Sequence, residues 1–463
     1  MTPLIVLLVL FAWVQLVSPE NVGWKSFLAE DPTEFHDIPL VWEDTTTVPS
    51  WLSGTYVRNG PGQISFGSPR RVLTSWLEGF AKLHSFKLSG SSVLFSGAML
   101  QSPNYVASVK AGELVPQITL NKFDSDEEEW TWWEKMQIAY KMFTGDEMGN
   151  NNPALWRIGQ ENDGIYLAVT DAKVPTRFNI SDLSTLGQEY PPSYPFTLNG
   201  CAHWMREPGT DNSINFNFKK GFTGPPWVEV LRYKPESTYQ TPEVIAKFKP
   251  SKFSYIHSFS VTENYVVFLF YPVIIDPKKY PESNFHVFEL FDGSNKTDTT
   301  DIFVVNLKNG DVKGPIPSAW TYAAHHINAY ENSDSEIILD LTPTPFDNMK
   351  DYLKLENMLN PPADGTKEAE ISTAGNLEVT RYKIGLKTGD VTTSTFPNRI
   401  NSRFINHFDF PTINEDYRGK KYCYAYGLSA FAYSRTALVK KNVCNPAEDK
   451  VSLSLYITML VYV

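Results

Sequence analysis

Residues 322–341 of the chain read Tyr-Ala-Ala-His-His-Ile-Asn-Ala-Tyr-Glu-Asn-Ser-Asp-Ser-Glu-Ile-Ile-Leu-Asp-Leu. His325 and His326 stand at the end of an extended segment, and an Asn-Ala-Tyr-Glu turn is predicted before a new strand at 337–341. Successive side chains of a strand point to opposite faces, so only one of the two histidines can face a given centre. In isolation, such a pair is more often two ordinary polar residues at a strand end than part of a metal site.

The rest of the chain is also predicted to be rich in β-strands. Gly, Pro, Asn and Asp clusters separate short β-branched or aromatic runs at 54–57, 82–88, 164–169, 264–270 and 301–306. Many short strands without strand–helix alternation indicate a propeller or a large barrel. No repeat motif sets a blade number, and no low-complexity linker divides the chain. We therefore expect one all-β domain.

Composition excludes some functions and leaves others open. The chain has 463 residues, of which 42% are hydrophobic and 14% aromatic, enough for a sizeable core. Its net charge of −11 argues against a nucleic-acid partner, which would require a basic surface. The three cysteines, Cys201, Cys423 and Cys444, cannot form a disulfide framework, and none lies in a zinc-type CxxC motif.

The N-terminus predicts a route through the secretory pathway. Residues 3–17 are almost wholly apolar and resemble the core of a signal peptide, which we place at 1–20. This run is shorter than the roughly 20 residues of a membrane-spanning helix. The sequons at Asn179 and Asn295 predict N-glycosylation of a secreted, extracellular protein. A cytoplasmic, membrane-associated protein is the alternative.

Two stretches break the β pattern. A helix is predicted at 125–143, with acidic residues in its first turn, where the helix dipole favours them. We interpret Trp132, Trp133, Met136 and Phe143 as a membrane-facing surface, and packing on the propeller is an equally good reading. The acidic run at 127–129 opposes attraction to anionic lipid, so apolar insertion would have to drive peripheral binding. A second short helix is predicted at 352–360.

Two further histidines share the context of His325. His203 and His257 each precede a turn after which a strand returns, and the three histidines are 54 and 68 residues apart. These spacings suit successive propeller blades with insertions. Inner strands of a propeller approach one axis, so the three imidazoles are predicted to converge. Neutral imidazoles suit iron, copper, zinc or nickel, and the spacing does not choose among them.

Several ordered motifs resemble one known family, the carotenoid cleavage oxygenases, and in particular the animal carotene oxygenases and the retinoid isomerohydrolase. They are Leu52-Ser-Gly-Thr-Tyr-Val-Arg-Asn-Gly-Pro-Gly62, Trp76-Leu-Glu-Gly-Phe-Ala-Lys-Leu-His-Ser-Phe86, Tyr255-Ile-His-Ser-Phe259, His325-His-Ile-Asn-Ala-Tyr-Glu331 and Tyr424-Ala-Tyr-Gly-Leu428. The similarity covers about 24–443, and residues 444–463 are expected to be an atypical tail.

This resemblance implies a seven-bladed β-propeller with a few helices capping its top face. It also implies a non-haem Fe(2+) ion on the axis, held by four histidines. His203, His257 and His325 match three of these ligands. A structural role is expected for the remaining histidines considered, which are His84, His286, His326 and His407.

Acidic residues hold the ligand imidazoles in this family. Asp171 and Asp409 stand where the family usually has glutamate. Aspartate is one methylene shorter, which argues against its direct contact with the ligand ring at both places.

The C-terminus departs from the family pattern. Family members continue to a fourth histidine, whereas no histidine follows His407 here, and residues 451–463 match no family motif. We therefore expect a C-terminally truncated chain whose last blade is incomplete.

The resemblance implies an enzyme that cleaves a carotenoid or apocarotenoid double bond with O2 to carbonyl products. No side chain beyond the metal ligands is singled out as catalytic. The missing fourth histidine and the two aspartates favour an alternative, an inactive carotenoid- or retinoid-binding protein. A retinoid isomerase on the same framework is a further alternative, and a secreted glycan-binding propeller is a remote one.

Overall fold

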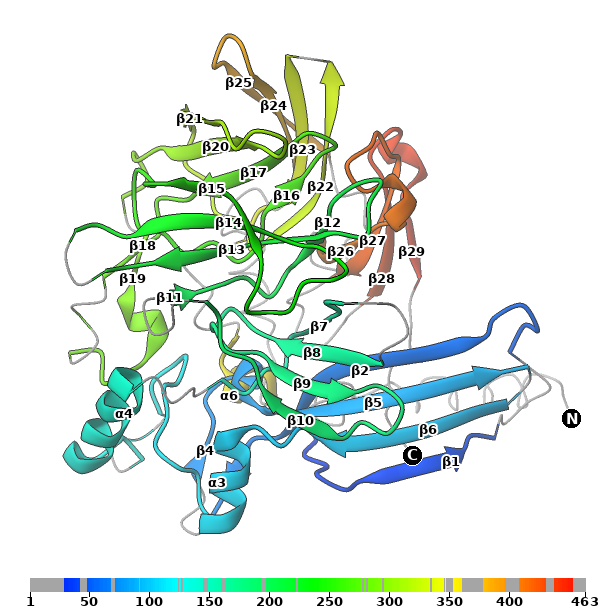
Figure 1. Cartoon of the computed structure of the whole chain (residues 1–463), viewed down its shortest axis with the longest axis vertical. Coiled ribbons are helices and arrows are strands. Elements are labelled where there is room, and N and C mark those ends of the chain that lie inside the picture. The colour runs from blue at the N-terminus through cyan, green and yellow to red at the C-terminus, as the bar shows by residue number, and fades with distance from the viewer. Residues whose placement is uncertain are drawn as a thin grey trace, which may run out of the picture.

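Antiparallel strands form most of the regular secondary structure of the described residues (Figure 1). The computed structural model describes residues 29–452 except for the gaps at 42–47, 68–70, 91, 124, 126–127, 145–148, 160–163, 193–196, 222–223, 277–278, 280–281, 294, 334, 345, 347–352, 360–377, 397–407 and 430–436. The predicted signal peptide, His407 and residues 453–463 lie outside the described part.

Six sheets of four or five strands follow one another along the chain as propeller blades. In spatial order, the first blade consists of β1 (Phe35–Pro39), β6 (Ser92–Met99), β5 (Phe80–Ser89) and β2 (Gly54–Gln63). The second consists of β10 (Thr185–Gln188), β9 (Thr176–Asn179), β8 (Ile165–Val169) and β7 (Ala154–Trp156). The third consists of β11 (Thr197–Asn199), β13 (Ser213–Lys219), β14 (Trp227–Tyr233) and β15 (Glu243–Phe248), with β12 (Met205–Arg206) also paired to β13.

The other three blades repeat this plan. The fourth consists of β16 (Ser260–Val261), β17 (Tyr265–Phe270), β20 (Thr300–Asn306) and β21 (Val312–Ser318). The fifth consists of β22 (His325–Ser333), β23 (Glu336–Thr342), β24 (Val379–Gly385) and β25 (Val391–Phe396). The sixth consists of β26 (Phe408–Thr412), β27 (Tyr424–Ser429), β28 (Ala437–Asn442) and β29 (Lys450–Ser452). Two small hairpins complete the sheets, β3 (Ser65–Phe66) with β4 (Arg71–Val72) and β18 (Ile274–Ile275) with β19 (Phe291–Asp292).

The predicted all-β propeller is confirmed, but the predicted number of blades is wrong. The described residues form six blades rather than seven. The sequence has no repeat motif from which blades could be counted, so the predicted number rested on the resemblance alone. Each of the five predicted strand segments overlaps a strand, namely β2, β5, β8, β17 and β20.

The turn predicted at 328–331 is also wrong, because strand β22 continues through it to Ser333. Asn328, which suggested the turn, is buried within the strand. Its side-chain amide donates hydrogen bonds of 3.0 Å to the carbonyls of Tyr417 and Lys420. A buried strand tolerates a polar residue when its hydrogen bonds are satisfied in this way.

Apolar side chains between neighbouring blades form the core. Val267, Ile302 and Val304 of the fourth blade pack with Leu339 and Leu341 of the fifth. The faces of β17 and β23 are almost entirely buried, as expected for sheets covered on both sides. This packing brings the first residues of the inner strands together, because β12 contacts β16, β16 contacts β22, and β22 contacts β26.

The sixth blade extends past residue 443, where the predicted tail begins. Its last strand, β29, pairs with β28. A disulfide joins Cys423 and Cys444 at the end of the β27–β28 hairpin. Lys441 forms a buried ion pair with Asp449 at 2.8 Å. The three cysteines thus provide one cross-link, and residues 444–452 belong to the blade.

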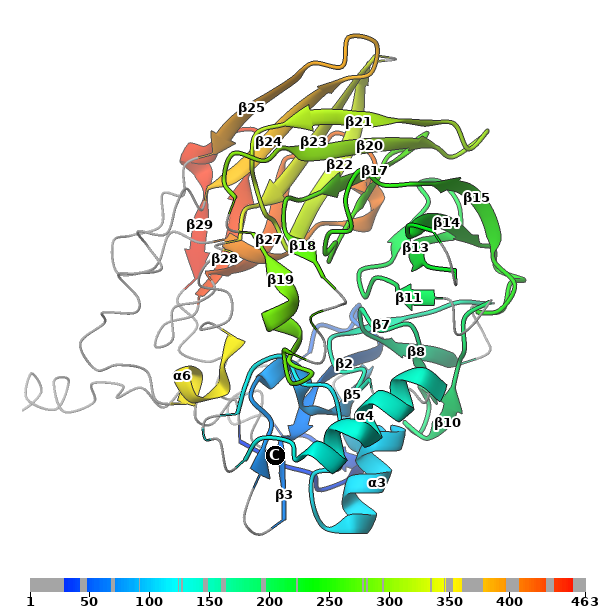
Figure 2. The same cartoon turned by 90° about the vertical axis from the view of Figure 1, so that its left-hand side faces the viewer.

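Three α-helices lie in the described part of the chain, and they gather on one side of the molecule (Figures 1 and 2). They are α3 (Pro103–Ala111), α4 (Trp132–Thr144) and α6 (Leu355–Leu359). Tyr105, Ile138 and Leu355, one from each helix, share a single core cluster. None of the described helices is long and apolar enough to cross a membrane.

Helix α4 begins seven residues after the predicted start at Ser125. Thr131 and Glu134 explain this, because the backbone N–H of each donates to the side chain of the other in a capping box. Helix α3 was not predicted, although Ser102 caps its start and Gly112, with φ of 70°, ends it.

Candidate metal centre

The structure brings His203, His257 and His325 together on the propeller axis. His203 lies between β11 and β12, His257 precedes β16, and His325 is the first residue of β22, so three successive blades each contribute one. One ring nitrogen from each histidine lies within 4.8 Å of the others. The Nε2 atoms of His203 and His257 are 3.0 Å apart. The three side chains form the one group of this kind found in the described residues.

Carboxylates orient two of the three rings. Nδ1 of His257 lies 2.6 Å from Oδ2 of Asp171, and Nδ1 of His325 lies 2.7 Å from Oδ1 of Asp409. A carboxylate in this position accepts the Nδ1 proton and leaves the Nε2 lone pair facing the centre. Aspartate therefore reaches the ligand ring at both positions, contrary to the expectation from its shorter side chain.

Asp171 reaches His257 because its loop is bonded to the loop that carries His203. Its backbone carbonyl accepts a hydrogen bond from the N–H of Gly200 at 3.1 Å. Its Oδ1 atom accepts one from the N–H of Ala202 at 2.9 Å. The hydroxyl of Tyr255 donates to Oδ2 at 2.5 Å. These bonds hold the carboxylate against the imidazole.

Asp409 is held from its own strand and from the neighbouring blade. It lies in β26, is 1% exposed, and accepts a hydrogen bond from the N–H of Phe410 at 2.8 Å. The hydroxyl of Thr342, in β23, donates to the same oxygen at 3.1 Å. The contact with His325 therefore links the fifth and sixth blades.

The pKa values of His203 and His257 are shifted in opposite directions. Burial, followed by the charges of His257 and His325, holds the pKa of His203 well below its ordinary value. Burial also acts to lower the pKa of His257, but the charge and hydrogen bond of Asp171 outweigh it and raise that pKa. His203 is thus a neutral imidazole near pH 7 and available as a ligand.

The donor set fits a transition metal. Two imidazole nitrogens at about 2.1 Å from one ion and at right angles to each other would lie about 3.0 Å apart. The Nε2 atoms of His203 and His257 have this separation. Imidazole nitrogens suit iron, copper, zinc and nickel, and the three rings would be the protein's ligands.

Three other histidines, His84, His286 and His326, serve the fold. His326 points away from the centre, with Nδ1 at 2.9 Å from the Ser260 hydroxyl and Nε2 at 3.0 Å from the Tyr271 hydroxyl. Burial lowers the pKa of His326 to about 3. His84 stacks on Phe95 in the first blade. His286 binds Thr119 and Glu129 through its two nitrogens, which ties the segment before α4 to the segment before β19.

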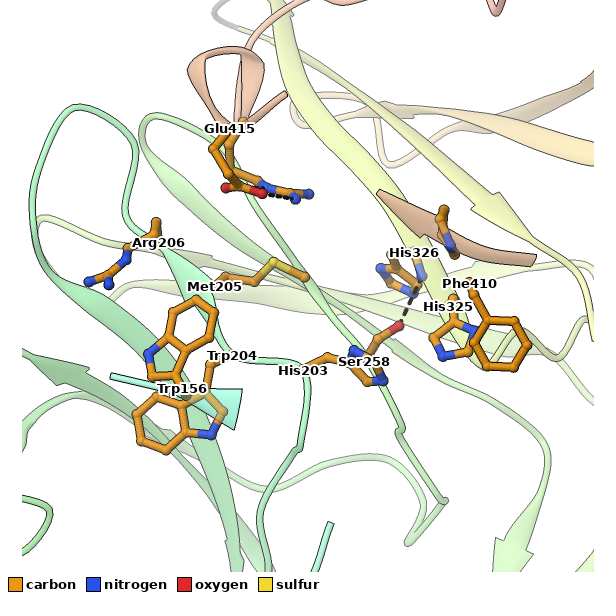
Figure 3. Close-up of a pocket in the computed structure, with 12 residues that line it drawn as sticks. Trp156, His203, Trp204, Met205, Arg206, Ser258, His325, His326, Phe410 and Glu415 are labelled. Atoms are coloured by element: carbon orange, nitrogen blue, oxygen red, sulfur yellow. Dashed lines mark hydrogen bonds and ion pairs between the residues drawn. The ribbon is translucent and has the colours of Figure 1, made fainter. Parts of the chain in front are cut away.

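A cavity of about 260 Å³ opens from the histidine group (Figure 3). His203, His325 and Ser258 line one end. Aromatic and apolar side chains contribute Trp156, Trp204, Met205, Phe410 and Pro411. Arg206, Glu415 and Arg418 add charged groups to its wall.

Several residues at the site were not predicted from the sequence. Tyr255 lies two residues before His257 in the motif Tyr255-Ile-His-Ser-Phe259, and this closeness could have predicted that it lies beside the site. Thr342, Trp156 and Arg206 carried no such signal, because long-range packing alone brings them to the site.

The predicted membrane-facing residues on α4 are largely exposed. Trp132, Trp133 and Met136 are 72%, 65% and 48% exposed. The side chain of Phe143 lies outside the described residues. Helix α4 also has a packed face, through Ile138. One face of α4 therefore packs on the rest of the protein, and the three predicted residues lie outside that packed face.

Both sequons form tight local turns. The side-chain oxygen of Asn179 accepts hydrogen bonds from the N–H and hydroxyl of Ser181. The side-chain oxygen of Asn295, which is exposed, accepts the same pair from Thr297.

Comparison with known proteins identifies relatives of this chain. A family profile described as "Retinal pigment epithelial membrane protein" matches residues 30–456. The mouse (Mus musculus) protein named beta,beta-carotene 15,15'-dioxygenase is 24% identical over 84% of this chain and 72% of its own length. The mitochondrial carotenoid-cleaving dioxygenase of Macaca fascicularis is 26% identical over 67% of this chain, which spans 56% of that protein.

Solved structures show the same fold. A Glu-to-Asp variant of Synechocystis apocarotenoid oxygenase superposes with a TM-score of 0.71 at 20% identity, covering 94% of this chain and 84% of the other. The cobalt-substituted form of the Synechocystis protein superposes with a TM-score of 0.69 at 20% identity and the same coverage.

Proposed function

This chain belongs to the retinal pigment epithelial membrane protein family, and we propose that it is a non-haem iron(II) oxygenase. It would cleave one double bond of a carotenoid or apocarotenoid with O2 and give two carbonyl products. The observation that carries the proposal is the convergence of His203, His257 and His325 beside a cavity with aromatic walls. The names of the mouse and macaque relatives support this chemistry.

Iron(II) held by His203, His257 and His325 would supply O2 activation beside the polyene. The protein's own residues set the geometry. Asp171 and Asp409 keep two imidazoles in the tautomer that presents Nε2 to the metal. The ring of Phe410 lies 5.3 Å from that of His325 and, with Trp204, gives the cavity an apolar surface suited to a hydrocarbon. The cobalt-substituted Synechocystis structure supports the proposal that a protein of this fold holds a metal.

Product analysis tests the proposal. The full chain is loaded with iron(II) without oxygen, mixed with a panel of carotenoids and apocarotenoids, and exposed to O2. We expect aldehyde or ketone products, and a loss of at least a hundredfold in His203→Gln. The matched control is His84→Gln, which changes a half-buried histidine of the first blade. The absence of any carbonyl product across the panel, or equal rates in both variants, would refute it.

A second candidate is a polyene-binding protein without turnover. The described residues supply three imidazoles, whereas the resemblance implies four. Metal analysis separates the two proposals, because one tightly bound iron per chain counts against the binding protein. A retinoid isomerase, the third candidate, would form its product without O2, so incubation under anaerobic conditions distinguishes it.

We also propose peripheral membrane contact through the adjacent helices α3 and α4. Large apolar side chains exposed by at least 46% on them are Val106, Val109, Trp132, Trp133, Met136 and Tyr140. Such a patch fits insertion into the interfacial region of a bilayer, where aromatic rings are favoured. Trp132→Glu/Trp133→Glu should abolish co-sedimentation with phosphatidylcholine vesicles, and Leu186→Glu on β10 serves as the control. Equal sedimentation of both variants would contradict this contact.

The Cys423–Cys444 disulfide supports the proposed secretory route, because such bonds persist in oxidising compartments. The exposed Asn295 sequon is compatible with glycosylation at that site, and Asn179 is the last residue of β9. Expression in a eukaryotic secretory host should yield a chain that loses mass on glycosidase treatment. Asn295→Gln and Asn179→Gln should each remove one glycan. Unmodified protein in the medium would refute the glycosylation sites.

A further inference from the structure

The cavity beside the histidine group contains a guanidinium that the proposed chemistry does not use. Arg206 ends the short strand β12, two residues after Trp204 and three after His203. Figure 3 shows its side chain on the opposite side of the two tryptophans from His325. The same cavity thus has potential metal ligands at one end and a cation at the other.

Local contacts hold Arg206 in place and leave part of its donor set open. The guanidinium carbon lies 5.1 Å from the ring centre of Trp156, a cation–π distance. Nη1 donates to the carbonyl of Asp211 at 3.1 Å and to the hydroxyl of Ser213 at 3.2 Å. The same hydroxyl accepts the indole N–H of Trp156 at 3.0 Å. Within the described part of the chain, Nε and Nη2 of Arg206 have no acceptor.

The carboxylates around the cavity compensate the charge of Arg206 only from a distance. Glu415 is the one carboxylate among the residues that line the cavity, and both of its oxygens bind Arg418, at 2.6 and 3.2 Å. No carboxylate of a described residue lies within ion-pair distance of Arg206. Burial and the nearby charge of Arg157 lower the pKa of Arg206, and the charges of Asp211 and Glu415 offset this lowering only in part. A half-buried cation of this kind gains from an added anion.

We propose that Arg206 binds the terminal carboxylate of a polyene acid that occupies this cavity. The inference rests on the proposed function and narrows its substrate class to apocarotenoids with an acidic end group. A guanidinium fork matches a carboxylate, and the free Nε and Nη2 edge can bind both of its oxygens. Trp156 and Trp204, stacked at 27° with ring centres 6.2 Å apart, would flank the adjoining double bonds.

The size of the cavity agrees with a partly enclosed ligand. Its volume of about 260 Å³ lies just below the range of about 300–1,000 Å³ for pockets that enclose a whole drug-sized ligand. It therefore suits the acidic end of a polyene, while the remaining hydrocarbon extends past the histidines.

Binding measurements with three C20 polyenes test the assignment. Retinoic acid, retinal and retinol share one hydrocarbon and differ in the end group. Their dissociation constants are measured by quenching of tryptophan fluorescence with the full-length, metal-free chain. We expect the acid to bind at least tenfold more tightly than the aldehyde. In Arg206→Gln this preference should fall by roughly tenfold to hundredfold, the range for a hydrogen-bonded charge pair.

Two further variants test whether the acid preference depends on the position of Arg206 and on its guanidinium group. Arg177→Gln removes the same charge from β9, where Arg177 pairs with Glu189, and should keep the acid preference. Arg206→Lys keeps the positive charge but loses the guanidinium fork, and it should retain part of the acid preference. Circular dichroism and the Tm of each variant report on folding. Equal binding of acid and aldehyde by the natural chain, or an unchanged preference in Arg206→Gln, would overturn the inference.

Two other ligands test carboxylate binding by Arg206 separately from the proposed oxygenase activity. Palmitic acid carries the carboxylate without the polyene, and binding as tight as that of retinoic acid would overturn the substrate class. Beta-carotene lacks any carboxylate, so its cleavage by the iron-loaded chain tests the proposed oxygenase alone. Cleavage without an acid preference refutes only the role of Arg206. An Arg206-dependent acid preference without cleavage of any polyene refutes only the oxygenase.

Discussion

Replacing Asp409 by asparagine is expected to weaken iron binding without a large change in shape. The Asp409 carboxylate is 1% exposed, and its Oδ1 lies within hydrogen-bonding distance of Nδ1 of His325, the hydroxyl of Thr342 and the N–H of Phe410. Asparagine is of similar size, but it lacks the negative charge that stabilises the Nδ1–H tautomer of His325.

The size of the effect follows from these contacts. A hydrogen bond to a charged group contributes about 1.5–3 kcal/mol and a neutral one about 0.5–1.5 kcal/mol, so the orientation of His325 loses about 1 kcal/mol or more. Loss of such a partner of a metal-binding histidine typically costs 10- to 100-fold in metal affinity. We therefore expect the iron(II) dissociation constant of Asp409→Asn to rise roughly tenfold to hundredfold.

Competition with a chelator under anaerobic conditions measures this constant. Asp301→Asn, on β20, is the matched control. Asp301 is 7% exposed, accepts hydrogen bonds from Ser251 and Thr299, and forms an ion pair with Lys252, but contacts no histidine of the described residues. The control should bind iron within about twofold of the natural chain. An Asp409→Asn protein with unchanged iron affinity would refute the orienting role of this carboxylate.

Three further changes test the fold around the site. The pKa of His326 is lowered to about 3, so the unfolded chain binds more protons between pH 6.5 and 3 and stability is lost as pH falls through that window. Because of this group, the free energy of unfolding of the metal-free chain should fall by about 2 kcal/mol between pH 7 and 5. Urea unfolding of His326→Asn should show a smaller fall over the same pH range. Cys423→Ser/Cys444→Ser removes a cross-link over 21 residues and should lower the free energy of unfolding by about 3 kcal/mol; no change would mean that the blade does not need it. Tyr255→Phe deletes the donor to Asp171 and should cost about 2 kcal/mol in urea unfolding of the metal-free chain, whereas stability equal to that of the natural chain would contradict this bond.

The sequence was sufficient for features that depend on neighbouring residues. The strand-end context of His203, His257 and His325 predicted their convergence, because inner strands of a propeller begin near one axis. Alternation along β22 correctly separated His325 from His326. The caps Ser102 and Gly112 would also have located helix α3.

Features that depend on distant contacts could not be predicted in this way. Asp171 reaches His257 because its loop binds Gly200 and Ala202, about 30 residues further along the chain. Cys423 and Cys444 flank β27 and β28, so their pairing follows from the register of that hairpin and not from cysteine spacing. The hydrogen bonds that satisfy the side chain of Asn328 within its strand come from Tyr417, Gly419 and Lys420, in a distant segment.

The fate of labelled oxygen tests the central proposal most directly. The chain is loaded with iron(II), given a carotenoid or apocarotenoid that it binds, and exposed to ¹⁸O2, after which the masses of the products are measured. Cleavage by the three-histidine centre predicts two shorter carbonyl products that carry the label from O2. An unchanged polyene, or only an isomer of the same mass, would contradict the assignment of this chain as an oxygenase.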